Sequence, residues 1–387
     1  MNKKNHASPN HCVSLPDAVW HQAFRRRLRA WFDRSARDLP WRRTRDPYAV
    51  WLSEVMLQQT QVVTVIPYFE RFLKTFPTIE ALARADEHDV LRLWEGLGYY
   101  RRARQLHRAA QVIVAEYGGV FPRDPQTVRR LPGIGRYTAG AVLSIAFDAR
   151  EPILEANTVR LFSRLLAYRG NPASAEGQSL LWAMAEAVLP RGKTNRIEPS
   201  GPVYGVGRLN QALMELGGQV CEPREPHCEA CPVASLCQAN RQGLQREVPS
   251  PKARQRWESV REAAVLVHRR GRLLLLRWPE GRRWAGLWDF PRFPVSAEQP
   301  AALHRELIEN VRQLTGVVVS PGMRIKTLTH GVTRFRITLD CYRAEYVVCS
   351  KNADTDTMET RWLRPAELAD YPLSSTGRTL TTLAHLK

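Results

Sequence analysis

The chain has 387 residues, with 57 Lys and Arg against 38 Asp and Glu, and its formal net charge is +19. A chain of this length with 44% hydrophobic residues is expected to form two or three domains. No run approaches the roughly 18 uninterrupted apolar residues of a membrane helix, and the polar start of the chain is unlike a secretory signal. The excess positive charge favours a polyanionic partner, with nucleic acid ahead of an anionic membrane surface.

Residues 18–240 carry the pattern of a compact all-α domain. Residues 1–17 are predicted to be a disordered basic tail. Apolar residues recur at helical spacing from Trp20 to Phe32, and a second helix is predicted from Tyr48 to Thr60. Short helical segments separated by Pro, Gly and Asp continue to about residue 240, with almost no strand-like alternation.

Residues 241–261 are rich in Arg, Lys and Pro, which predicts a basic interdomain linker able to lie along a phosphate backbone. Residues 262–387 then switch to an α+β pattern. Ala263–His268 and Leu273–Leu276 flank a turn typical of a hairpin, and a helix is predicted at about Pro300–Leu314. Further strand-like runs follow at Val317–Val319, Phe335–Tyr342 and Glu345–Val348.

Four of the seven cysteines are crowded together: Cys221, Cys228, Cys231 and Cys237. An odd total and one tight cluster favour a metal site in a reducing compartment over a disulfide framework. Four thiolates can hold either tetrahedral zinc or an iron–sulfur cluster, and the residues alone leave both open.

The stretch Leu131-Pro132-Gly133-Ile134-Gly135 lies between two predicted helices. The closely spaced Gly133 and Gly135 allow a tight turn with exposed N–H groups, and the helix that follows adds the positive end of its dipole. An anion such as a DNA phosphate is therefore expected to dock here, and a plain helix–helix turn is the alternative.

A predicted helix places Glu54 among the apolar residues Val50, Trp51 and Val55. Burial raises the pKa of a carboxyl and allows it to stay protonated as an acid near neutral pH. The alternative is an ordinary exposed glutamate on an amphipathic helix, and the pattern alone favours that alternative.

Together these motifs resemble those of the MutY-type adenine DNA glycosylases, which belong to the helix-hairpin-helix superfamily. The decapeptide from Trp51 to Thr60 closely matches that family, and the cysteine spacing resembles its [4Fe–4S] loop, here 221–237. The resemblance covers roughly residues 18–380 and is strong through 240. It implies a multidomain chain: an all-α helix-hairpin-helix glycosylase core with a [4Fe–4S] cluster in a structural role, then an α+β Nudix-like lesion-recognition domain.

The resemblance also implies two catalytic carboxyls. The family's glutamate at the position of Glu54 protonates the adenine ring, and a second carboxylate steadies the electron-poor sugar. That second group is an Asp in Leu-Asp-Gly-Asn, whereas this chain has Leu154-Glu155-Ala156-Asn157. Glu155 is expected to carry the role with Asn157 as a hydrogen-bonding partner, although misplacement by about an ångström can cost about a hundredfold in rate.

Tyr137 stands where lyase-competent relatives carry a Lys that forms a Schiff base. Tyrosine cannot form that imine, so hydrolysis without strong strand cleavage is expected. The Tyr137 hydroxyl is expected to help hold the second carboxylate, and a packing tyrosine at a helix start is the alternative.

The extruded base needs a pocket and a wedge. The family's residues around the opposing base match Gln59, Thr60, Leu97 and Tyr99, and its adenine-side lining matches Arg37, Leu39, Trp41, Arg42 and Gln211. Trp41 and Tyr99 would equally suit a core.

The C-terminal domain of the family reads 8-oxoguanine with a Phe-Ser-His turn. Aligned from His330, this chain has Val332-Thr333-Arg334, in which Thr333 keeps a hydroxyl and Arg334 is suited to a phosphate. The segment Arg305–Asn310 resembles part of the Nudix hydrolase motif, but Pro291 and Ala297 occupy the positions of the upstream Gly and Glu of that motif. A non-catalytic reader domain is therefore expected.

The expected function is a monofunctional adenine DNA glycosylase that acts on adenine mispaired with 8-oxoguanine or guanine in base excision repair. It is expected to work as a monomer on double-stranded DNA, in the cytoplasm and associated with the nucleoid, without a membrane partner. The alternatives are an endonuclease III-like glycosylase/lyase, a non-catalytic iron–sulfur DNA-binding regulator and, last, a Nudix-type pyrophosphatase.

Overall fold

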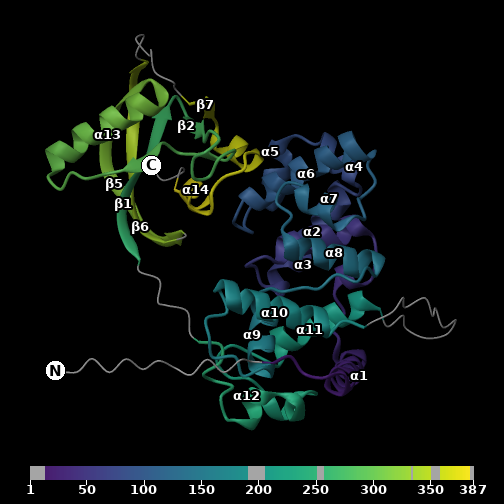
Figure 1. The fold of residues 1–387 in the computed structure, drawn as a ribbon. Coiled ribbons are helices and arrows are strands. Elements are labelled where there is room, and N and C mark those ends of the chain that lie inside the picture. Colours follow the sequence, from purple (N-terminus) through teal and green to yellow (C-terminus); the bar gives the residue numbers. More distant parts are fainter. Residues whose placement is uncertain (1–13, 191–204, 251–256, 333, 350–357, 384–387) are drawn as a thin grey trace, which may run out of the picture. The chain divides into compact units, whose positions relative to one another are not determined.

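The computed structural model describes residues 14–190, 205–250, 257–332, 334–349 and 358–383 (Figure 1). The chain divides into two compact units, and each combines two stretches of sequence. Unit 1 comprises residues 1–59 and 116–252, and unit 2 comprises residues 60–115 and 253–387.

The regular elements of unit 1 among its described residues are all helices, which confirms the all-α prediction for this part. Its elements are α1 (Ala18–Ser35), η1 (Pro40–Arg42), α2 (Pro47–Leu57), α7 (Pro125–Arg130), α8 (Arg136–Phe147), α9 (Ala156–Leu165), α10 (Ala175–Ala187), α11 (Val206–Gln219), η2 (Cys228–Ala230), η3 (Ala234–Leu236) and α12 (Gln238–Arg241), where η marks a 3-10 helix. The predicted helix from Tyr48 to Thr60 ends early, at Leu57, because Gln58 leaves helical geometry and Gln59 has a φ of +57°.

Helix α2 forms the centre of unit 1. Asp46 caps its N-terminus by accepting hydrogen bonds from the N–H groups of Tyr48 and Ala49, and Pro47 fills the first helical position. Every residue from Tyr48 to Met56 is buried, and α2 packs against α8, which packs in turn against α11. A helix with apolar residues all round is a core helix, so a polar side chain on α2 faces the protein interior.

Unit 2 combines helices with a mixed sheet. The elements are α3 (Val62–Thr75), α4 (Ile79–Arg84), α5 (Glu87–Trp94), α6 (Arg101–Tyr117, which runs into unit 1), β1 (Glu258–Arg269), β2 (Arg272–Arg277), β3 (Trp288–Asp289), β4 (Arg292–Pro294), α13 (Pro300–Thr315), β5 (Val317–Val332), β6 (Phe335–Cys349), β7 (Thr360–Leu363), η4 (Pro365–Asp370) and α14 (Ser375–Thr381).

The sheet has the order β3-β2-β1-β6-β5, with β4 paired to β1 and β7 to β2. Strands β1 and β6 run parallel, whereas β1–β2 and β5–β6 are antiparallel. The predicted hairpin is confirmed, because β1 and β2 are joined through Arg270 and Gly271, both with positive φ. This mixed sheet with helices confirms the α+β prediction for the C-terminal part.

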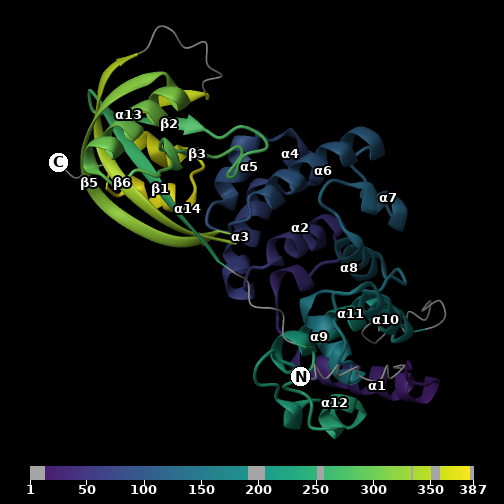
Figure 2. The ribbon, with the colours of Figure 1, turned by 60° about the vertical axis from the view of Figure 1, so that its left-hand side comes forward.

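Both faces of the sheet are buried, since residues alternate between two cores along β1. Ala263, Val265 and Val267 pack with α13, while Ala264 and Leu266 pack with the C-terminal helical segment. Strands β5 and β6 are longer than the predicted runs, and Figure 2 shows their curvature. The pairing of β5 with β6 has register shifts between Val318 and Val319 and between Pro321 and Lys326.

The predicted linker, 241–261, is partly structured. Leu244 and Val248 are buried against Ala239, and β1 already begins at Glu258. Among the described residues, no helix combines the length and hydropathy that crossing a bilayer requires.

Candidate active site and DNA interface

Glu54 lies inside unit 1 with a side chain that is only 5% exposed. Burial raises its pKa to about 7, and the nearby Glu155 carboxylate adds to the rise, while a hydrogen bond from Tyr137 and the charge of Arg42 oppose it. This environment excludes the alternative of an exposed glutamate. A carboxyl with this pKa is partly protonated at neutral pH and is therefore suited to general acid catalysis.

Tyr137 is the direct partner of Glu54. It lies in the first turn of α8, and its hydroxyl donates a hydrogen bond to Glu54 Oε2 at 2.7 Å and lies 3.3 Å from Met214 Sδ. Burial and the nearby carboxylates of Glu54 and Glu155 raise the pKa of Tyr137, so the phenol stays a donor. The prediction that Tyr137 holds Glu155 is therefore wrong, because its hydrogen bond goes to the first carboxyl rather than the second.

Glu155 caps the N-terminus of α9. Its carboxylate accepts hydrogen bonds from the N–H groups of Asn157 at 2.8 Å and Thr158 at 3.0 Å, and the Thr158 hydroxyl accepts one from Glu155 N at 2.7 Å. Burial raises the pKa of Glu155, while these N–H groups oppose that rise. The Glu155 side chain, which is longer than the family's Asp, is accommodated because it folds back onto its own helix. Ala156 replaces the family's Gly without strain because it occupies a helical position.

Asn157 and Arg160 connect this cap to the cysteine loop. Arg160 Nη2 donates to Asn157 Oδ1 at 2.8 Å and to Gly217 O at 2.6 Å, and its Nε donates to Cys221 O at 2.7 Å. A Cβ on Gly217 would lie 2.8 Å from Asn157 Cβ, so only glycine allows α11 to approach α9 this closely.

Arg37 and Arg42 converge on Glu215 of α11. Arg37 donates to both carboxylate oxygens at 2.8 Å, and Arg42 Nη2 donates to Oε2 at 2.8 Å. Burial would raise the pKa of Glu215, but these hydrogen bonds lower it to about 2. Glu215 therefore stays ionised and holds both arginines, of which Arg42 lies close enough to Glu54 for its charge to lower the pKa of that carboxyl.

The other predicted adenine-side residues surround this cluster. Leu39 and Trp41 are buried, at 5% and 6% exposed, so Trp41 has the burial of a core aromatic. Gln211 is half-buried on α11, one turn before Met214 and Glu215, and helical spacing puts these three on one face.

The glycine turn has the geometry of a helix-hairpin-helix. It joins α7 to α8, with Gly133 at a φ of +75° and Gly135 as the N-cap of α8. Leu131 and Ile134 are buried and anchor the turn. A Cβ on Gly135 would meet nothing within 4 Å, so the start of α8 is open to an approaching phosphate.

The residues predicted around the opposing base fall at the junction of α2 and α3 and in the α5–α6 loop. Gln59 is exposed and belongs to unit 1. Within unit 2, Arg102 Nη2 donates to Thr60 Oγ1 at 3.2 Å and to Leu97 O at 3.3 Å. The side chain of Leu97 is buried, whereas Tyr99 is 54% exposed, which excludes a core role for Tyr99. The Arg102 guanidinium lies 5.5 Å from the centroid of the Tyr99 ring.

In the predicted reader turn, Thr333 lies outside the described residues. Arg334 is exposed, and its Nε lies 3.3 Å from Glu258 Oε1. Elsewhere in this domain, Glu306 of the partial Nudix motif accepts hydrogen bonds from the backbone N–H groups of Ser296 and Ala297, so it braces a loop.

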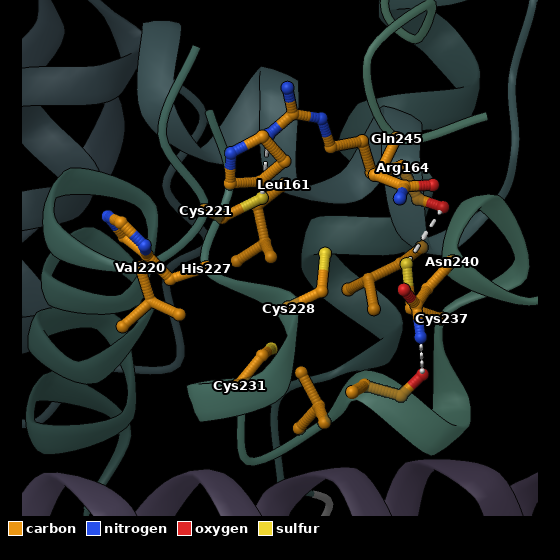
Figure 3. Close-up of a pocket in the computed structure, with 14 residues that line it drawn as sticks. Leu161, Arg164, Val220, Cys221, His227, Cys228, Cys231, Cys237, Asn240 and Gln245 are labelled. Carbon is orange, nitrogen blue, oxygen red and sulfur yellow. Dashed lines mark hydrogen bonds between the residues drawn. The ribbon is translucent and has the colours of Figure 1, made fainter. Parts of the chain in front are cut away.

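The four cysteines of the loop line one pocket, and Figure 3 shows their side chains directed toward it. Arg164 is buried and donates to Cys221 Sγ at 3.3 Å and to the carbonyl oxygens of Glu222 and Pro223 at 2.7 and 3.0 Å. Within the described ranges, no three His, Cys, Asp or Glu side chains meet as ligands of a single metal ion.

The donor set of this cavity fits a metal–sulfur cofactor. Burial raises the pKa of Cys231 to about 12 and that of Cys237 to about 11, so thiolates here require a positively charged partner. A cluster ligated by four thiolates would supply that partner and occupy the shared cavity.

Comparison with known proteins assigns the class. Residues 52–186 match the family model described as HhH-GPD superfamily base excision DNA repair protein, and residues 262–382 match the NUDIX domain. The helical part is similar to a solved thermostable thymine-DNA glycosylase, at 28% identity and a TM-score of 0.51, over 58% of this chain and 100% of that chain. Fold and site thus define a helix-hairpin-helix DNA repair glycosylase with an appended Nudix-like domain.

Two relatives show which family of DNA glycosylases the chain belongs to. The chain is 33% identical to the adenine DNA glycosylase of Rattus norvegicus over 96% of this chain and 79% of that protein. It is 34% identical to the adenine DNA glycosylase of Homo sapiens over 83% of this chain and 66% of that protein. The chain belongs to the adenine DNA glycosylase family, which confirms the family expected from its motifs.

Glu215 and Met214 are site residues that the sequence analysis missed. The signal for Glu215 was present, because a single acidic residue lies between Leu213 and Leu216 in an apolar stretch, just as Glu54 does on α2. An acidic residue on a buried helix face requires a cationic partner, and Arg37 and Arg42 supply it.

Proposed function

We propose that this protein hydrolyses the N-glycosidic bond of adenine in double-stranded DNA when that adenine is mispaired with 8-oxoguanine or guanine. The observation that carries the proposal is the pairing of the buried acid Glu54 with Tyr137 beside a second carboxylate, Glu155. The exposed start of α8 and the net charge of +19 support binding to a DNA backbone.

In the proposed reaction, Glu54 gives a proton to a ring nitrogen of the extruded adenine. The bond between the sugar C1′ and the base nitrogen breaks, its electron pair goes to the adenine, and the sugar becomes an oxocarbenium-like cation. The carboxylate of Glu155 stabilises that cation. Water then adds a hydroxyl to C1′ and releases a proton, which leaves an abasic site.

Tyr137 has a positioning role in this proposal. Its hydrogen bond at 2.7 Å fixes the orientation of the Glu54 carboxyl, so that the other oxygen is free to carry the transferred proton. A phenol does not form a Schiff base with the sugar, so the reaction stops at base removal, and the strand stays intact until alkali cleaves it.

We further propose that Cys221, Cys228, Cys231 and Cys237 hold a [4Fe–4S] cluster. Bound there, the cluster would fasten the loop 221–237 and supply no redox step to base removal. The shared cavity and the buried thiols support it. We also propose that the protein acts on DNA as a monomer, in the cytoplasm with the nucleoid. Of these points, the strongly basic composition supports the DNA partner.

The proposal is tested on duplexes that carry adenine opposite 8-oxoguanine, opposite guanine or opposite thymine. Wild type and Glu54→Gln are incubated with each duplex, and the products are examined before and after hot alkali. Strand cleavage that requires alkali, occurs with the first two duplexes and disappears in the variant is the expected result. Cleavage without alkali would instead indicate a lyase, and tight binding without an abasic product would indicate a non-catalytic regulator.

A further inference from the structure

The loop Gly96–Tyr100 joins α5 to α6 and has an unusual backbone. The φ angles of Gly96, Gly98 and Tyr99 are +98°, +71° and +49°. A tyrosine adopts a left-handed conformation only where its surroundings hold it there. Because the Tyr99 side chain is 54% exposed, burial of its ring does not supply that restraint.

Arg378 on α14 binds the residue that immediately precedes this loop. Its Nε donates to Glu95 Oε1 at 2.6 Å and its Nη2 to Glu95 Oε2 at 2.9 Å, directly before the loop. Arg378 also donates to the carbonyl oxygens of Leu368 and Tyr371 at 2.8 and 2.7 Å. The guanidinium is thus fixed by its own segment and holds Glu95 in a bidentate pair.

The far end of the loop is tied to the same C-terminal segment. The Tyr100 hydroxyl donates to Leu373 O at 3.1 Å and accepts from Gly96 N at 3.4 Å. Leu373 N in turn donates to Glu95 Oε2 at 3.4 Å. The two ends of the loop are therefore bracketed by residues 368–378, all within unit 2.

We propose that Arg378 is a positioning residue for adenine excision: its pair with Glu95 sets the loop conformation that presents Tyr99 to DNA. An exposed aromatic ring on a restrained loop is suited to stack on bases that have lost a neighbour when the adenine leaves the duplex. The C-terminal domain thereby takes part in the reaction through the α5–α6 loop. This inference rests on the proposed function.

The test compares Arg378→Gln, Glu95→Gln and Tyr99→Ala, alone and combined, in the full-length protein. Arg108→Gln is the matched control, because it removes the same charge from α6 at a pair with Glu280, which lies outside residues 368–378. Single-turnover adenine excision is measured, together with the fluorescence of a 2-aminopurine placed next to the target, which reports unstacking. Thermal melting of each variant, including the conservative change Arg378→Lys, distinguishes an altered loop conformation from a loss of the folded structure.

Arg378→Gln and Glu95→Gln are expected to slow excision by about tenfold and to reduce the fluorescence rise, while Arg108→Gln stays within about twofold of wild type. In a Tyr99→Ala background, Arg378→Gln should have little further effect, since both act through one ring. Multiplicative effects of these two changes, or equal losses in Arg378→Gln and Arg108→Gln, would overturn the inference. If wild type itself excises no adenine, the proposed function fails instead.

Discussion

The hydroxyl of Tyr137 donates a 2.7 Å hydrogen bond to the Oε2 atom of Glu54, whose pKa burial raises to about 7. The bond stabilises the ionised carboxylate and so opposes the effect of burial. In Tyr137→Phe that opposition is lost, and the pKa of Glu54 should rise further. We expect the alkaline fall of the excision rate to move to higher pH by up to about 1 unit, as measured by single-turnover kinetics from pH 5 to 10. An unchanged or lower midpoint would contradict this relationship.

The capping role of Glu155 can be separated from its charge. Glu155→Gln keeps an oxygen that accepts the N–H bonds of Asn157 and Thr158, whereas Glu155→Ala removes the cap. We expect both variants to lose about a hundredfold or more in excision rate, but only the alanine variant to lose a further 1–2 kcal/mol or so of unfolding free energy. Denaturant melts and single-turnover rates give the two quantities. Full activity in Glu155→Gln would show that the charge is dispensable.

Replacing Glu215 leaves two arginines without their shared anion. We expect Glu215→Gln to lower the free energy of unfolding by about 3 kcal/mol, because the carboxylate is fully buried. Since the pKa of Glu215 is held near 2, its contribution is complete above pH 4.5 and is lost as the pH falls toward 2. Between pH 4.5 and 2, the free energy of unfolding of wild type should therefore fall more than that of Glu215→Gln. Asp38→Asn, at the exposed pair with Arg43, is the control and should leave stability unchanged.

The four cysteines that share a pocket predict the iron content of the purified protein. The protein as isolated should contain about four iron atoms per chain and absorb broadly in the visible range. Cys228→Ser should lose most of both, while Cys349→Ser, at an exposed thiol outside the cavity, should keep them. Elemental analysis and visible absorption decide the matter. Zinc in place of iron, or equal iron in both variants, would contradict the proposed cluster.

The sequence predicted residues whose role depends on local pattern. The glycines at 133 and 135 indicated the turn before α8, and the crowding of cysteines indicated one shared site. These features follow from spacing along a single loop. The burial of Glu54 did not follow in this way, because the pattern alone favoured an exposed glutamate.

What the sequence could not predict depends on packing between distant segments. Glu215 meets Arg37 only because α11 approaches the segment after α1 in three dimensions. The same holds for Tyr137, whose hydrogen-bond partner was predicted as Glu155 and is Glu54, since the choice depends on how α8 packs against α2. The early end of α2 depends on the backbone angles of Gln58 and Gln59, which no residue preference dictates.

The central claim is that Glu54 acts as a protonated acid within this buried site. The most direct test is the pH dependence of single-turnover adenine excision by wild type, from pH 5 to 9, with Glu54→Gln as the reference. Because only the protonated carboxyl transfers a proton and burial sets its pKa at about 7, the rate should fall about tenfold per pH unit above pH 7. A rate that stays level to pH 9, or a Glu54→Gln variant with wild-type activity, would contradict the claim.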